Sequence, residues 1–487
     1  MYSMKVYPLD RRSLESLHKA TLAVLNNPGM KILAAELVDG LKKKGAKVDE
    51  SKNIVRFPQR LIENTLEQIQ KEIRGGIRQN ILNGDLSSKT DGTIQAKFGG
   101  ACHEYIDYDK QEVRKPTRED LVNLLQLGEA IPEVALVGNP VMLLEESGKP
   151  VDPRLQPVKT AAIVAKNTSK PASTEIWRPE ELDFLVDIGV VVRGSLEKYK
   201  KNPCFITAKE TVSPLILGKE AGEVLLALAK RGLPCTIMPM AIAGAGTPVT
   251  KAGNVVIANA EILGTLVAIR ALAPDALVAG SVSTGIMDMA TGNACFATAE
   301  AIIQDLMLAQ LHEELYGFDF GIGTGITDAK YPGIQAAIEK EMKFIASALT
   351  NRTNYPVGTL MGAKRFSPEQ SMIDLEIVRY IHETFYKEIS VDENDLAIQV
   401  IEKVGPGGNF IGEDHTLQNF RKALWHPDLI DRTTSAGWIR DKERDMLAKA
   451  NQKWKEILKK SEPYHLDSDQ EKEIDKIVKK AERILTR

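Results

Sequence analysis

Residues 317–340 read GFDFGIGTGITDAKYPGIQAAIEK, a short apolar run followed by a glycine-rich loop and a helical pattern. The glycines are Gly321, Gly323 and Gly325, and a helix is expected to start near Pro332, because proline suits the first helical turn. α/β enzymes place their chemistry where the carboxyl end of a strand passes into a helix. The loop is therefore a candidate site, with an ordinary solvated turn as the alternative, and its polar side chains are Thr327, Asp328, Lys330, Tyr331 and Gln335.

The same succession of strand, polar loop and helix recurs along the middle of the chain. Helical patterns such as 252–273 and 335–350 separate short apolar runs. Eight runs in regular alternation with helices favour a TIM-type (β/α)8 barrel over a doubly wound sheet. The expected strands are Val134–Met142, Ala172–Ile176, Cys204–Lys209, Cys235–Met240, Leu277–Val282, Phe318–Gly323, Val357–Leu360 and Phe410–Gly412.

Three further regions flank this predicted barrel, which spans residues 134–425. Residues 1–80 show helical periodicity and predict a helical N-terminal region. Residues 81–133 predict a hairpin, with strands at 94–98 and 103–108, and a helix that Thr117 caps. Residues 426–487 are helical and highly charged, so we expect helices that pack on the barrel or on a partner subunit.

Composition excludes several classes of protein. The chain of 487 residues is 43% hydrophobic and 26% charged with a net charge of −3, which argues against a nucleic-acid surface or a polybasic membrane anchor. We find neither an apolar run of the roughly 20 residues that a membrane helix needs nor a signal peptide, and expect a cytoplasmic protein. The four cysteines and seven histidines lack metal-ligand spacing, so no tightly bound metal is predicted.

The loops that follow the expected strands should meet at one mouth of the barrel. Their side chains combine carboxylates with aromatic rings, which suits a cation such as a quaternary ammonium that cannot donate a hydrogen bond. Any one of them can be structural, for example in a buried ion pair. Beyond those already named, the residues are Glu175, Trp177, Lys209, Glu210, the 243–247 turn, Met287, Asp288, Met289, Thr291, Asn293, Phe296, Glu413, Asp414 and His415.

The loop glycines do not match a dinucleotide-binding fingerprint, because the spacing is wrong and no acidic residue follows a second strand. We expect Gly323, Gly325 and Gly246 instead to keep the loops short, so that a large planar cofactor or a partner protein can approach the backbone.

Four motifs in order resemble the trimethylamine methyltransferase family, and the resemblance extends from about residue 10 to residue 460. They are Phe98-Gly-Gly-Ala, Met289-Ala-Thr-Gly, Gly325-Ile-Thr-Asp-Ala-Lys with Gln335-Ala-Ala, and Asp414-His-Thr-Leu with Phe420-Arg421. The resemblance implies an α/β barrel that moves a methyl group from an amine to the cobalt of a small corrinoid protein, or of free cobalamin. Founding members contain pyrrolysine, whereas this chain has only standard residues. It therefore resembles the branch that demethylates glycine betaine, proline betaine or carnitine.

The resemblance, together with the chemistry of a quaternary nitrogen, assigns roles to the mouth residues. A quaternary amine leaves as a neutral tertiary amine, so attack by Co(I) needs no general acid, and the protein must chiefly hold and aim the substrate. Aromatic rings would face the ammonium, carboxylates would set a negative potential, and a cationic side chain would receive the carboxylate of a betaine. The assigned residues are Trp177, Phe296, Tyr331 and Tyr105 (rings); Asp288 and Glu210 (potential); Lys330 or His415 (carboxylate); Asp328 (orienting Lys330); and Asn293 and Gln335 (substrate contacts).

Two other classes of function stay open at this point. A barrel lyase or aldolase could form a Schiff base through Lys209 or Lys330. A non-catalytic subunit could use the mouth to bind a partner. For the leading hypothesis, the expected partners are a quaternary amine, a small corrinoid protein and further copies of this chain in a homo-oligomer.

Overall fold

The computed structural model describes residues 6–75, 95–318, 320–387, 389–440 and 445–486. Its centre is a set of short parallel strands, paired in the orders β20-β4-β7, β10-β11 and β12-β14-β16-β19. Two backbone hydrogen bonds, from Val137 N to Pro171 O and from Asn139 N to Ser173 O, join β7 to β10. The strands are β4 (Gln95–Phe98), β7 (Val134–Val137), β10 (Ala172–Ser173), β11 (Phe205–Ile206), β12 (Ala208–Lys209), β14 (Cys235–Ile237), β16 (Val278–Val282), β19 (Phe320–Ile322) and β20 (Asn354–Val357).

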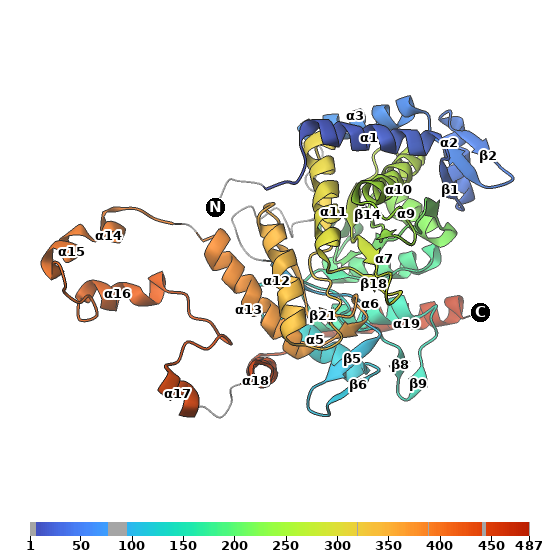
Figure 1. Ribbon diagram of the computed structural model, residues 1–487. Helices are drawn as coiled ribbons and strands as arrows, with labels where there is room; N and C mark the ends of the chain where they lie inside the picture. Colours follow the sequence, from blue (N-terminus) through green and yellow to red (C-terminus); the bar gives the residue numbers. More distant parts are fainter. Residues whose placement is uncertain (1–5, 76–94, 319, 388, 441–444, 487) are drawn as a thin grey trace.

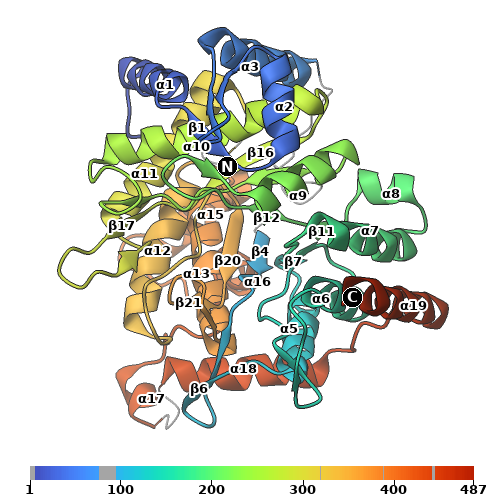
Figure 2. The same cartoon turned by 90° about the vertical axis from the view of Figure 1, so that its right-hand side faces the viewer.

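A helix follows most of these strands, and Figure 2 shows the helices arranged around them. This alternation makes the chain a mixed α/β protein, as its pattern predicts. The surrounding helices are α5 (Arg118–Ala130), α6 (Gln156–Asn167), α7 (Pro179–Arg193), α9 (Lys219–Lys230), α10 (Lys251–Leu272), α11 (Ala299–Gln310), α12 (Ile334–Ala348) and α13 (Pro368–Phe385).

Two strand predictions are wrong. The expected strand at Phe410–Gly412 is an irregular segment in which Ile411 is 83% exposed, whereas a strand of a central parallel sheet must be covered on both faces. The segment at 94–98, expected in a hairpin, is instead β4, which pairs in parallel with β20 and β7. Its alternation of polar and apolar residues is typical of a half-exposed hairpin and concealed this central position.

The N-terminal region covers α10 and adds a small sheet to the expected helices. Its helices are α1 (Arg11–Asn26), α2 (Ala35–Lys43) and α3 (Gln59–Arg74), and its strands are β1 (Met30–Ile32), β2 (Lys47–Asp49) and β3 (Ile54–Arg56). Among the described helices, α10 is the one long and apolar enough to cross a membrane, but 78% of its apolar window is buried within this protein. It is therefore a core helix of the fold.

The C-terminal helices pack on the same chain. Helix α18 (Met446–Lys460) lies against α13 and α5, and α19 (Ser468–Leu485) lies against α6 and α7. Between α13 and α18 the chain leaves the body, as Figure 1 shows in orange, through four short helices. These are α14 (Glu393–Leu396), α15 (Ile398–Val404), α16 (Asp414–Ala423) and α17 (Ser435–Arg440).

Candidate functional site

Two adjacent strand ends bring together an aromatic ring, an ammonium group and two carboxylates. Lys209 Nζ lies 3.8 Å from Glu175 Oε2 and 4.9 Å from the centre of the Trp177 ring. Lys209 is buried at the end of β12, beside Glu210, whereas Trp177 is 41% exposed. The ring of Trp177 thus already faces one cation and still presents surface to solvent, which is the arrangement by which proteins hold ammonium groups.

The backbone before α7 fixes the position of this ring. Trp177 N and Arg178 N donate to Glu181 Oε2 at 2.7 Å and 3.1 Å, in the first turn of that helix. Burial raises the pKa of Glu175, Lys209 opposes this change, and the nearby charge of Glu210 adds to it. Burial thus favours the neutral form of Glu175, and a cation bound beside it would favour the charged form.

The loop after β19 holds the neighbouring loop in place through Asp328. Its carboxylate accepts from Phe296 N at 2.9 Å and from Ala297 N at 2.8 Å. Lys330 Nζ donates to the main-chain carbonyl of Asp328 at 2.8 Å, so Asp328 contacts Lys330 through its backbone and not through its carboxylate. Asp328 instead positions Phe296, and a carboxylate that accepts two amide donors is already committed to the backbone.

Three other predicted substrate contacts lie in local arrangements of their own. Asp288 Oδ1 accepts from the backbone N–H groups of residues 290 and 291, and these bonds lower the pKa of its carboxyl group. Asn293 is exposed beside it, in the hairpin of β17 (Gly285–Met287) and β18 (Ala294–Cys295). Gln335 Nε2 donates to Glu339 Oε1 at 2.7 Å. Asp288 thus stabilises its own turn, and Gln335 bonds a neighbour on its own helix, α12.

Tyr331 remains available beside the loop. It is 50% exposed, and the guanidinium carbon of Arg365 lies 5.9 Å from the centre of its ring. Arg365 Nη1 also donates to Lys330 O at 3.0 Å. Lys330 and Tyr331 are therefore held at the surface by a cation that also pairs with Glu104.

The three loop glycines approach parts of this chain. A Cβ on Gly323 would lie 2.3 Å from Ser283 Oγ, and one on Gly325 would lie 2.4 Å from Pro356 O. At Gly246 the nearest atom would be Ser213 O, at 3.0 Å. Tight packing between neighbouring loops therefore explains these glycines.

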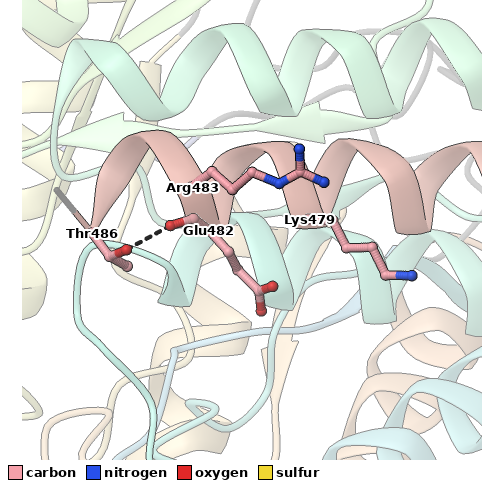
Figure 3. A pocket seen from close by; sticks show the side chains of 4 residues that line it. All are labelled: Lys479, Glu482, Arg483 and Thr486. Atoms are coloured by element: carbon pink, nitrogen blue, oxygen red, sulfur yellow. Dashed lines mark hydrogen bonds between the residues drawn. The ribbon is translucent and has the colours of Figure 1, made fainter.

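His415 and Tyr105 are not brought together with the other predicted residues. His415 lies on α16, outside the body of the protein (Figure 1). Tyr105 lies on β5 (Glu104–Asp107), with the Arg114 guanidinium 4.5 Å from its ring centre. It lines a hollow of about 380 Å³ that also includes Trp454 of α18. A second hollow, lined by Lys479, Glu482, Arg483 and Thr486 of α19 alone, is a surface feature (Figure 3).

Lys97 is a functional candidate that the sequence reasoning missed. An added Cβ on Gly128 of α5 would lie 3.4 Å from Phe98 Cδ2, so Phe98 faces the helices and Lys97, its neighbour on β4, faces the interior. Within the described chain no carboxylate pairs with Lys97, and burial lowers its pKa to about 8. The available signal was a lone lysine within the 94–98 strand.

Comparison with known proteins agrees with the motifs in the chain. The family model for trimethylamine methyltransferases matches residues 3–485. The chain belongs to this family. It is 29% identical over 451 residues to the trimethylamine methyltransferase MttB of Desulfitobacterium hafniense, covering 92% of this chain and 89% of that protein. It is also 25% identical over 463 residues to a glycine betaine methyltransferase of the same species, covering 95% and 94%.

A solved structure supports the fold. The monomethylamine methyltransferase MtmB of Methanosarcina barkeri matches with a TM-score of 0.53 and 10% identity, covering 99% of this chain and 89% of that one. The family model confirms the resemblance of the motifs, and the solved structure shows a likeness of fold.

Proposed function

We propose that this protein transfers a methyl group from a quaternary amine, with glycine betaine as the first candidate, to the Co(I) of a corrinoid protein. Proline betaine and carnitine are the nearest alternatives. The observation that carries the proposal is the cluster of Trp177, Lys209, Glu175 and Glu210, in a chain whose relatives include a glycine betaine methyltransferase. We also propose that the parallel strands, with the consecutive β11 and β12 counted as one segment, close into one eight-stranded barrel, since Thr324 Oγ1, just after β19, donates to Asn354 O of β20.

The proposed chemistry requires placement more than proton transfer. The substrate nitrogen is already quaternary and departs as a neutral amine, so the residues must hold a cation and aim one methyl group outward. Positive charge leaves the substrate during transfer, so a direct carboxylate contact would stabilise the ground state more than the transition state. The exposed ring of Trp177, with Glu175 and Glu210 behind it, meets this requirement.

The free carboxylate of a betaine needs a cationic partner in the same interior. Lys209 is engaged by Glu175, and Lys330 by a backbone carbonyl. Lys97 has no such partner among the residues that the structure describes, so we assign it the role of receiving the carboxylate.

Replacing Trp177 with alanine is expected to lower kcat/KM for a quaternary amine roughly 10- to 30-fold, because a cation–π contact in a desolvated site is lost. Trp177→Phe keeps an aromatic face and should lose less. Steady-state methylation kinetics with both variants would test the assignment. Equal losses in the two variants would remove the ring from the substrate site.

The reaction itself is tested by mixing the protein with a reduced corrinoid protein and following the absorbance change to methyl-Co(III) with a panel of quaternary amines. Methylation by one betaine would support both reaction class and substrate. The corrinoid protein must be shown to accept methyl groups from another donor. If no amine then gives methyl-Co(III), the proposal is wrong.

A Schiff-base lyase is the second candidate, and one observation favours it. An amine of pKa about 8 is partly neutral near that pH and can attack a carbonyl group, so Lys97 is a better nucleophile than the ion-paired Lys209. Borohydride trapping with a panel of carbonyl compounds separates the two readings. A covalent adduct that Lys97→Met abolishes would favour the lyase, whereas a carboxylate receptor gives no adduct.

A further inference from the structure

We propose that residues 389–424, here called the arm, dock on a second copy of this chain, against the exposed face of α12. The proposal concerns a surface far from the strand ends and is independent of the reaction proposed above.

The arm has no core of its own. Its helices α14, α15 and α16 contain no buried residue, and the hydrogen bonds and ion pairs that the arm makes with described residues of the chain stay within the arm. Its large apolar side chains are open to solvent. They are Ile389, Val391, Leu396, Ile398, Ile401, Phe410, Ile411, Leu417 and Leu424, exposed by 43% to 83%.

The helices of the arm need a binding partner that buries their apolar side chains if they are to stay folded. Helices of 4, 7 and 10 residues are too short to be stable in water by themselves. The nine apolar side chains together expose an area on the order of the roughly 800 Å² per partner that a stable protein interface buries. Exposed apolar side chains in this number are typical of an interaction site.

The exposed face of α12 is the matching surface. Ile334, Ile338 and Met342 follow one another at every fourth position and are 82%, 58% and 54% exposed. This spacing forms one stripe along the helix. Figure 1 shows the arm extending away from α12 of the same chain, so one molecule leaves both surfaces uncovered.

The C-terminal end of the arm and the α12 stripe carry opposite charges. On α16, Leu417 and Leu424 are flanked by the exposed Arg421 and Lys422, whereas Glu341 is exposed beside the α12 stripe. Two copies can exchange arms symmetrically, each covering the α12 stripe of the other.

The origin of the arm favours a second copy over a corrinoid protein. Helix α13 starts after the carboxyl end of β20 and runs back along the body, so the arm leaves from the opposite end of the strands. A partner that accepts methyl groups must reach the strand ends that carry Trp177 and Lys209. The arm lies at the other end of the strands, away from Trp177 and Lys209.

Sedimentation velocity of the full chain tests the proposal. Wild-type protein should sediment as a dimer or larger assembly at micromolar concentration, and Ile411→Asp/Leu417→Asp should weaken self-association at least ~10-fold, as should Ile338→Asp on α12. Leu196→Asp, at an exposed position on α8 (Leu196–Lys201) of the body, is the matched control. Circular dichroism checks that each variant keeps its helices, which is expected because the substituted side chains are exposed.

Pairing of the two surfaces is tested by charge exchange and by crosslinking. Arg421→Glu/Lys422→Glu should weaken assembly, and adding Glu341→Lys should restore it. Ile338→Cys mixed with Leu417→Cys should give a disulfide between two chains, which neither variant gives alone.

A monomeric wild-type protein, or assembly unchanged by the arm substitutions, would overturn the proposal. Unchanged self-association together with lost binding of a purified corrinoid protein would assign the arm to that partner instead.

Discussion

Replacing Lys97 with methionine is expected to stabilise the protein while abolishing methyl transfer from betaines. The ordinary pKa of lysine is 10.5, and burial lowers that of Lys97 to about 8. This difference corresponds to at most roughly 3 kcal/mol of destabilisation at neutral pH. Methionine has a similar length and no charge, so the variant removes the cost together with the proposed carboxylate receptor.

The difference in unfolding free energy between Lys97→Met and the wild type should depend on pH. Below pH about 8 the folded and unfolded states both carry the Lys97 charge, and the destabilisation is fully present. Between about 8 and 10.5 the unfolded state binds the extra proton, so wild-type stability rises with pH relative to the variant. Urea unfolding at pH 7 and at pH 10 should therefore show a gain in Lys97→Met that shrinks at the higher pH.

The functional half of the prediction has its own readout. Betaine demethylation should fall by at least ~100-fold, as the loss of a charge-assisted contact of about 3 kcal/mol implies. In wild-type protein, affinity for a betaine should weaken as pH rises through about 8, where Lys97 becomes neutral. Tetramethylammonium, which has no carboxylate, is the control substrate and should not show this loss. Unchanged betaine kinetics in Lys97→Met would remove Lys97 from the site.

Replacing Asp374 with asparagine is expected to destabilise the protein by roughly 3–5 kcal/mol, because it strands a buried ammonium group. Lys340 Nζ on α12 bonds Asp374 Oδ2 on α13, and both side chains have zero exposure. Asp374 Oδ2 also accepts from Gly358 N at 2.8 Å, at the end of β20. Asparagine can still accept that bond, but its amide nitrogen would then face Gln370 Nε2, which donates to Asp374 Oδ1 at 2.7 Å, so the variant changes this bond as well as the charge.

The double variant Lys340→Met/Asp374→Asn is the matched control. Removing both charges should recover most of the loss, since a buried pair contributes little net stability compared with apolar packing of similar volume. The midpoints of urea unfolding of the two variants measure the effect. An Asp374→Asn midpoint within error of the wild type would mean that Lys340 is neutral or solvated when folded.

The alternation of strands and helices could be predicted from the sequence because it is a local property. Runs such as Cys235–Ile237 and Val278–Val282 are mostly apolar and contain no charged residue, as is typical of strands covered on both faces. The central position of β4 could not be predicted from its own residues. Lys97 and Gln95 break its apolar run, and only pairing with β7 and β20, distant in sequence, makes it a central strand.

The candidate site was likewise predicted in part from local sequence and in part not. Glu175, Trp177 and Lys209 could be named because each follows an apolar run, and the folded chain brings them within contact distance. His415 also follows an apolar run, but that run is no strand. Asp328 was correctly placed on the loop, yet its partners are backbone amides of a different loop, which no pattern in the sequence indicates.

The sequence alone determined the family, the α/β class and the residue types of the site, because motifs, periodicity and composition depend on neighbours along the chain. Only the tertiary structure decided which groups are still free to act. In the folded chain Lys209 pairs with Glu175, the Asp328 carboxylate bonds backbone amides, Lys97 has no carboxylate partner among the described residues, and the arm extends away from the body. Burial and pairing depend on contacts between residues far apart in sequence, and these exist only once the chain has folded.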